Sequence, residues 1–142
     1  PRHRLDDARA LSGATLNIDG YQLAVGDASI KLFIALPTQF ARYVVVPEGI
    51  EQEDEEAFMG YVVEQLAALD IKVRKMLCGR THSIYQPGGN LYTRSVMLAD
   101  LEVEEAVKLQ QEGIGEHKKT GCGLFIPHKG IKAVHEMKAD KK

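Results

Sequence analysis

The stretch FARYVVVPEGIEQEDEEAFMGYVVEQLAALDIKVRKMLC, residues 40–78, decides the fold. Its opening segment, FARYVVV, is mainly β-branched or aromatic, and such a composition predicts a strand. After a Pro-Glu-Gly turn, apolar residues recur with the period of about 3.6 that is typical of an amphipathic helix over 54–69. These residues are Phe58, Val62, Leu66 and Leu69. Ile71 and Val73 then alternate with Lys72 and Arg74, which predicts a second strand over 71–78.

Residues 79–127 supply the second half of the same domain. The turn Pro87-Gly88-Gly89-Asn90 is followed by a predicted strand over 91–98. A helix comes next, which we expect Asp100 to cap and Gly113 to end, and then a last strand over 122–126. The order strand, helix, strand, strand, helix, strand is that of a ferredoxin-like domain. We therefore expect an α+β fold, with one antiparallel sheet that carries both helices on the same face.

The N-terminal residues do not amount to a complete domain. A short helix is predicted over 5–12, and Asp19-Gly20 predicts a hairpin because such turns need residues that tolerate positive φ. A further strand is predicted where apolar residues alternate at Ile30, Leu32, Ile34 and Leu36. We expect 1–36 to be the C-terminal part of a first ferredoxin-like domain, 37–130 to be a complete one, and 131–142 to be a basic tail.

The composition is that of a globular protein without a membrane segment. The chain has 142 residues, of which 44% are hydrophobic and 27% charged. No apolar run approaches the roughly 18 residues that cross a bilayer, and the start, PRHRLD, is no secretion signal. Two cysteines are too few for a disulfide framework. We therefore expect a cytoplasmic protein that contacts no membrane.

The charges are segregated along the chain, although the net charge is only −2. From Glu48 to Glu56 there are six acids and no base, whereas residues 71–99 hold five bases and no acid. From Glu116 to the end there are seven lysines and three acids. This pattern permits a phosphate-binding side, but an ordinary solvated surface fits it equally well.

A glycine-rich loop, GIGEHKKTGCGLFIP over 113–127, follows the second predicted helix. Glycines let backbone amides approach an anion closely, and neighbouring lysines neutralise phosphate. The loop is neither a dinucleotide-binding fingerprint, which follows a strand, nor a P-loop, because no Gly-Lys-Ser/Thr is present. On the residues alone, a helix end followed by a crowded turn explains the glycines equally well.

This loop resembles the C-terminal glycine-rich loop of the CRISPR repeat-processing endoribonucleases of the repeat-associated mysterious protein superfamily. The match lies in Gly113, Gly115, Gly121 and Gly123 and in the LFIP that follows. Upstream, LSGATLNIDGYQLAVG over 11–26 is similar to the segment that links the two ferredoxin-like domains, particularly in the smaller myxobacterial-type branch. Members of this family have an N-terminal domain that is largely absent here, which favours a fragment.

The resemblance implies a function in CRISPR precursor RNA processing. Such enzymes bind repeat RNA and cleave it without a metal or other cofactor, because the ribose 2′-OH attacks the adjacent phosphate to give a 2′,3′-cyclic phosphate. A general base and a group that stabilises the phosphate charge are needed. The catalytic histidine of the family usually lies in the N-terminal domain, so no catalytic residue is carried over. His82 is the candidate within this chain.

The predicted RNA contacts come from the loop and from the acid-free stretch. In and after the loop they are Gly113, Gly115, His117, Lys118, Lys119, Gly121, Gly123 and Lys129, and we expect Arg74, Arg80 and Arg94 to extend the surface. Cys78, His82, Cys122 and His128 could be imagined as a zinc site, but their spacing matches no standard pattern, so we expect no metal. Tyr85 and Tyr92 are expected to pack in the core or in a turn.

Two other functions stay open at this point. A non-catalytic subunit of a CRISPR complex would have the same fold and RNA contacts without cleavage, and other subunits of the complex would be its partners. A small-molecule-binding ferredoxin-like domain that dimerises through its sheets would have a ligand pocket and no affinity for RNA at about 150 mM salt.

Overall fold

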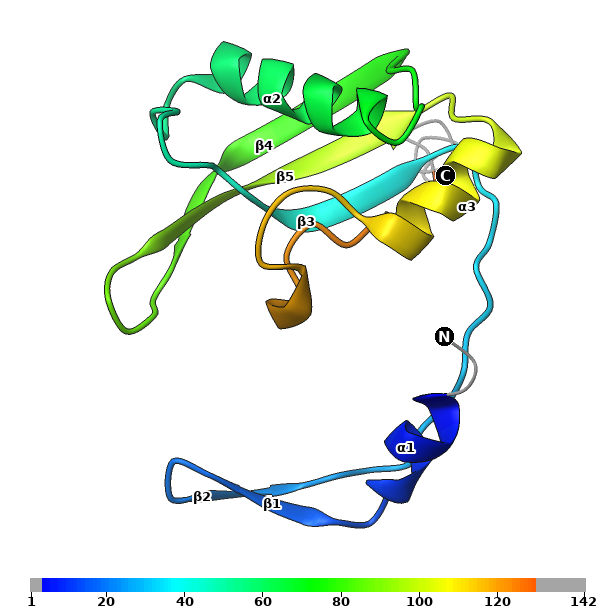
Figure 1. The fold of residues 1–142 in the computed structure, drawn as a ribbon, viewed down its shortest axis with the longest axis vertical. Helices are drawn as coiled ribbons and strands as arrows, with labels where there is room; N and C mark the ends of the chain where they lie inside the picture. Colours follow the sequence, from blue (N-terminus) through cyan, green and yellow to red (C-terminus); the bar gives the residue numbers. More distant parts are fainter. Residues whose placement is uncertain (1–3, 130–142) are drawn as a thin grey trace, which may run out of the picture. The chain divides into compact units, whose positions relative to one another are not determined.

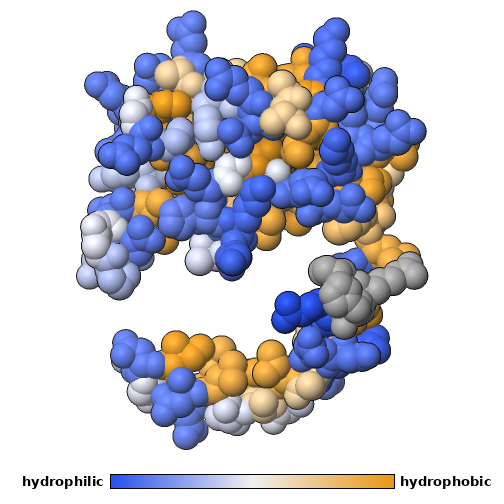
Figure 2. All heavy atoms as spheres, viewed as in Figure 1, coloured by the Kyte–Doolittle hydropathy of each residue, from blue (hydrophilic) through white to orange (hydrophobic). Residues whose placement is uncertain are grey.

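The computed structural model describes residues 4–129, which divide into two compact units at Leu32/Phe33. Unit 1 contains helix α1 (Leu5–Ala10) and the antiparallel strands β1 (Thr15–Ile18) and β2 (Tyr21–Ala24) (Figure 1). The hairpin turns at Asp19 and Gly20, whose φ angles of 51° and 84° confirm the predicted turn. Apolar side chains gather along this hairpin (Figure 2) and are exposed, with Tyr21 78% accessible.

The strand predicted over 30–36 is wrong. Residues 25–36 form no helix or strand, and the apolar side chains from Ile30 to Leu36 are exposed. The alternation is present in the sequence, but within residues 4–129 no neighbouring strand pairs with this segment. The assignment of the N-terminal part to a preceding domain stays a prediction, and the predicted tail, 131–142, lies outside the described residues.

Unit 2 has the predicted ferredoxin-like architecture. Its elements are β3 (Gln39–Val45), α2 (Glu55–Ala67), β4 (Lys75–Ile84), β5 (Leu91–Ala99), α3 (Val103–Glu112), the 3₁₀ turn η2 (Lys118–Thr120) and β6 (Ile126–Pro127). The strands form one antiparallel sheet in the order β4-β5-β3-β6 (Figure 1). The two central strands, β3 and β5, are the first and third strands of unit 2 along the chain, as in a split βαβ arrangement. The α+β prediction is therefore confirmed.

Both helices pack on one face of the sheet. Phe58 and Val62 of α2, Leu109 of α3, and Val44 and Val96 of the central strands are fully buried in one hydrophobic core. Burying such side chains contributes roughly 1.5–3 kcal/mol each. Among residues 33–129 no helix covers the opposite face, which is called the open face below.

The predicted helix starts and strand ends need three corrections. Glu102, not Asp100, caps α3, because Glu102 and Glu105 form a reciprocal capping box. Strand β4 begins at Lys75, not at residue 71, and continues past the predicted end at residue 78, because β5 pairs with it as far as Ile84. The last strand is confined to 126–127, since residues 122–125 close the glycine loop instead.

Two β-bulges face each other across β5. The register of β3 shifts between Ala41 and Val44, and that of β4 shifts between Cys78 and Thr81, so both extra segments lie opposite Ser95. A bulge bends its strand and re-aims side chains. The two bulges position Arg42 and Tyr43 on β3, and they determine on which face the side chains beyond them lie.

Candidate nucleic-acid interface

The glycine loop is closed by its first and last glycines. The Ile114 amide donates to the Gly123 carbonyl at 2.9 Å, so the two ends of the loop cross. Gly113 and Gly123 have φ angles of 62° and 71°, which favour glycine. A Cβ at Gly113 would lie 2.5 Å from the Gly123 carbonyl oxygen, and a Cβ at Gly123 would collide with that of Ile114. These two glycines are therefore required for the close crossing.

The amides of three of the four loop glycines are already used inside the protein. Gly113 donates to Leu109 at 2.9 Å, Gly121 to Lys118 at 3.1 Å, and Gly123 to Tyr43 at 2.6 Å. Gly113 and Gly123 are also buried. The expectation that these amides face a phosphate is wrong for Gly113, Gly121 and Gly123, because backbone carbonyls of this chain already accept their hydrogen bonds.

The exposed tip of the loop, residues 115–119, has a different character. Within residues 4–129, the amides of Gly115, Glu116 and His117 donate to no other group. Gly115 has a φ of 75° and His117 is left-handed, with φ 59° and ψ 33°. Successive amides in turns of this kind form concave sites for anions. Lys118 and Lys119 follow at once, are exposed, and form no ion pair with any described residue.

Tyr61 of α2 lies behind the loop tip. Its hydroxyl is 3.2 Å from the position that a Cβ on Gly115 would occupy. Burial raises the pKa of Tyr61, and the Glu116 carboxylate raises it further. The phenol therefore stays protonated and can donate a hydrogen bond beside the tip. The sequence did not single out Tyr61, because it lies in the middle of a predicted helix and far from the loop along the chain.

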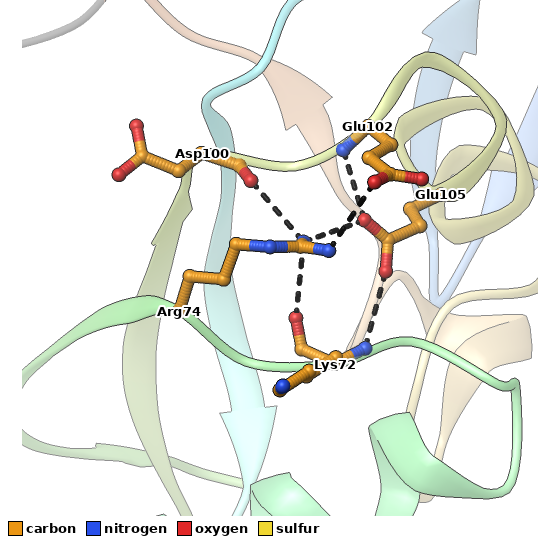
Figure 3. A network of polar contacts seen from close by, with 5 residues as sticks. All are labelled: Lys72, Arg74, Asp100, Glu102 and Glu105. Carbon is orange, nitrogen blue, oxygen red and sulfur yellow. Dashed lines mark hydrogen bonds and ion pairs between the residues drawn. The ribbon is translucent and has the colours of Figure 1, made fainter.

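Arg74 belongs to a polar network that fastens β4 to the start of α3 (Figure 3). Its Nη1 donates to Glu105 Oε1 at 2.7 Å and to the carbonyls of Lys72 and Asp100, and its Nη2 lies 3.6 Å from Glu102. The hydrogen bond to Glu105 raises the pKa of Arg74 above its ordinary value. With these partners the guanidinium has a structural role, and it lies at the end of α3 away from the glycine loop.

Glu105 is the acceptor at the centre of this network. Burial alone would raise the pKa of Glu105, but hydrogen bonds from the Glu102 amide, from Arg74 and from the Lys72 amide outweigh it and hold that pKa below the ordinary value. A carboxylate with three donors is strongly favoured in its ionised form. The network is therefore anionic at its centre, which makes it a poor contact for RNA phosphates.

Arg94 is buried and also has a structural role. Only 4% of the residue is accessible, and its guanidinium donates to the Gln52 carbonyl at 3.0 and 3.3 Å and to the Gly79 carbonyl at 3.0 Å. It lies 6.0 Å from the centre of the Phe58 ring. The expectation that Arg94 extends an RNA surface is wrong, because Arg94 alternates in step with the core residues Val96 and Leu98 of β5 and so shares their helix-covered face of the sheet.

The remaining predicted residues are exposed. Arg80 lies at the bulge of β4, beside a hollow that Glu53 and Glu55 also line, and Lys129 is exposed at the end of the described residues. His82 is an exposed strand residue of β4 and lines a hollow on the open face. The structure thus brings the loop residues together, separates Arg74 and Arg94 from them, and leaves Arg80 and His82 accessible.

The predicted packing of the two tyrosines holds for one of them. Tyr85 is 87% accessible, so it does not pack in the core. Tyr92 is half-buried and lines a hollow with the acidic segment after β3.

Three residues that the sequence did not single out, Phe40, Arg42 and Tyr43, line a hollow on the open face together with His82. The composition of FARYVVV predicted a strand, but the bulge brings Arg42 and Tyr43 to the hollow.

The cysteines and histidines that the structure describes do not gather around a common point. Among residues 4–129, no group of three or more His, Cys, Asp or Glu side chains is arranged to hold a metal ion. Burial raises the pKa of the Cys78 thiol, and Glu55 raises it further against an opposing effect of Arg94. Cys122 is buried. The imagined zinc site is therefore not formed by the described residues.

None of the described helices is long and apolar enough to cross a membrane.

Comparison with known proteins places the chain in a family. The chain is 30% identical over 117 residues to a CRISPR-associated endonuclease Cas6 of Myxococcus xanthus (strain DK1622). This similarity covers 82% of the chain and 49% of the relative, so the chain spans about half the length of that protein. The sequence pattern of the Cas6 CRISPR family matches residues 1–130, and the chain belongs to this family.

Proposed function

We propose that this chain binds CRISPR repeat RNA and forms part of an endoribonuclease that processes CRISPR precursor RNA. The observation that carries this proposal is the exposed loop tip, where the amides of Gly115 to His117 stand beside Lys118 and Lys119. Family membership and the similarity to an endonuclease Cas6 support the same conclusion. The whole enzyme's activity is inferred from a relative twice as long as the matched region.

The tip suits the backbone of folded RNA better than its bases. A-form RNA hides its base edges in a deep, narrow groove, so proteins grip a stem through phosphates and 2′-hydroxyls. Amide groups that converge on one point bind a single phosphate, and the two ammonium groups neutralise its neighbours. Lys129 and Arg80 are exposed and extend the set of available cations. Arg74 and Arg94 are not part of this set, because both are held by internal partners.

The reaction we propose is transesterification within the RNA. The 2′-OH loses its proton to a general base and attacks the adjacent phosphorus, while the bond to the 5′-oxygen breaks and that oxygen takes up a proton. A 2′,3′-cyclic phosphate and a 5′-OH result. Donors that hold the phosphate stabilise the charge of the transition state. The loop tip supplies such donors, and His82 is the candidate for the general base within this chain.

The test is cleavage of repeat RNA in the presence of EDTA, with analysis of both product ends. The proposal predicts cleavage at one position with a 2′,3′-cyclic phosphate on one product and a 5′-OH on the other. A His82→Ala variant that binds RNA but does not cleave would assign the base to His82. Binding without cleavage by the full-length protein would instead support a non-catalytic subunit. Absence of any RNA binding at about 150 mM salt would refute the proposal.

A further inference from the structure

The open face of the sheet contains a hollow of about 320 Å³ that no predicted function explained. Three strands line it: Phe40, Arg42 and Tyr43 of β3, His82 and Ser83 of β4, and Ser95 of β5. Binding sites for small ligands start at roughly this volume. A single nucleoside or nucleotide fits a site of this size, whereas a folded RNA stem does not.

The hollow is built by the two bulges rather than by a chance gap. Both lie opposite Ser95, which lines the hollow. Gly79 stands against Ser95, and a Cβ at this position would collide with the Ser95 hydroxyl oxygen. On the other side, the extra residues of β3 bring the Arg42 guanidinium 5.5 Å from the centre of the Tyr43 ring. A cation and an aromatic ring are thus held at one edge of the hollow.

The lining combines aromatic surface, hydroxyls and positive charge. Phe40 pairs with His128, with ring centres 5.9 Å apart. His128 Nδ1 is buried and has no hydrogen-bond partner among the described residues. Among residues 4–129, no carboxylate lines the hollow, and Arg42 is exposed. Aromatic rings beside a cation and without an acid are the combination that binds an unpaired base and its phosphate.

The hollow adjoins the closing end of the glycine loop. The Gly123 amide donates to the carbonyl of Tyr43 at 2.6 Å, so the closing residue of the loop lies on the bulge that lines the hollow. The aromatic and cationic lining, next to a loop that we propose to bind RNA, favours RNA over an unrelated small molecule as the occupant.

We infer that the open-face hollow binds one unpaired nucleotide of the RNA beside its base-paired stem. Its base packs on Phe40 and Tyr43, Arg42 contacts its phosphate, and the hydroxyls of Ser83 and Ser95 with His82 are available for hydrogen bonds. This inference rests on the proposed function, because it takes repeat RNA as the substrate. It adds a second contact that distinguishes a stem with a single-stranded extension from a stem alone.

The test compares the affinity for a repeat stem with that for the same stem carrying a single-stranded extension, by fluorescence anisotropy. The variants are Phe40→Leu, which removes the ring but keeps an apolar side chain, and Arg42→Gln, which alters an exposed residue and leaves folding intact. Tyr85→Leu is the matched control, because Tyr85 is exposed but does not line the hollow. Phe40→Leu should weaken binding of the extended RNA roughly 5- to 100-fold, the range for losing one stacked base, and Arg42→Gln should weaken it through the loss of a phosphate contact. Both variants should leave binding of the stem alone unaffected.

The outcomes separate this inference from the proposed function. Equal affinity of the unaltered protein for both RNAs, or losses that are the same for both, would overturn the hollow as a nucleotide site while the stem contact stands. Failure to bind either RNA would overturn the proposed function itself. Dimerisation that depends on protein concentration and is broken by Arg42→Gln would assign the hollow to a second copy of the chain.

Discussion

Replacing Gly123 by alanine tests whether the loop glycines serve the fold rather than the RNA. Gly123 is buried, has a φ of 71°, and connects two segments through hydrogen bonds to Ile114 and Tyr43. The new methyl group would collide with the Ile114 carbonyl oxygen, so the crossing of the loop must open. Gly121→Ala is the matched control, because Gly121 has a φ of 95° but no atom within 4 Å of the added Cβ.

The expected losses follow from these geometries. A left-handed alanine costs about 1–2 kcal/mol, and this cost applies to both variants. Only Gly123→Ala also disturbs two backbone hydrogen bonds, each of which contributes about 1 kcal/mol. We expect a loss of about 3–4 kcal/mol for Gly123→Ala and of about 1–2 kcal/mol for Gly121→Ala. The first value is a large share of the roughly 5–15 kcal/mol by which domains are stable.

Urea unfolding followed by circular dichroism measures both values. With a slope of about 2 kcal/mol per molar, the midpoint should fall by about 1.5–2 M for Gly123→Ala and by less than about 1 M for Gly121→Ala. Equal shifts for the two variants would refute the close crossing at Gly123. A Gly123→Ala variant of normal stability that no longer binds RNA would show that this glycine contacts the ligand after all.

Two other substitutions test the polar networks. Glu105→Gln should lower the stability by about 2 kcal/mol at pH 7, because an amide oxygen replaces a carboxylate with three donors. Since the pKa of Glu105 is lowered in the folded state, its stabilisation is present above the unfolded value of about 4.3 and is lost as the pH falls through the folded pKa. The difference in free energy of unfolding between the variant and the unaltered protein, measured by urea unfolding, should therefore shrink below about pH 4. A difference that does not depend on pH would contradict this role of Glu105. Arg94→Met should lower the free energy of unfolding by about 3 kcal/mol, because the Gln52 and Gly79 carbonyls lose their donor. The RNA affinity of the folded protein should stay unchanged. A selective loss of affinity in binding assays would instead show that Arg94 contacts RNA.

The order of helices and strands could be predicted because its signals are local. The helical period of Phe58, Val62 and Leu66, and the turn residues at Asp19-Gly20 and 87–90, need no knowledge of distant partners. The extent of β4 could not be predicted in this way. Residues 79–84 are mainly polar, and they are a strand because β5 pairs with them. The reverse holds for residues 30–36: their apolar alternation is clear in the sequence, but no strand among the described residues pairs with them.

The candidate site was harder to predict than the fold. Four glycines near two lysines fit an anion site and a crowded crossing equally well in sequence. The structure shows the crossing at Gly113 and Gly123, and a tip at 115–117 whose amides donate to no other described group. Arg94 was assigned to the RNA surface because it lies in the acid-free stretch, although it shares a face of β5 with the core residues Val96 and Leu98. The bulge of β3, which leaves no mark in the sequence, explains why Arg42 lines a hollow.

The salt dependence of repeat-RNA binding tests most directly whether the loop tip grips phosphates. Lys118→Gln/Lys119→Gln removes two cations from the tip, and Lys72→Gln/Lys75→Gln removes the same charge at the start of β4, the edge strand farthest from β6 in the sheet. We predict that the slope of log affinity against log salt falls by about 1.5–2 for the tip variant and stays unchanged for the control. An unchanged slope for the tip variant, or the same decrease in both, would contradict an RNA grip at this loop.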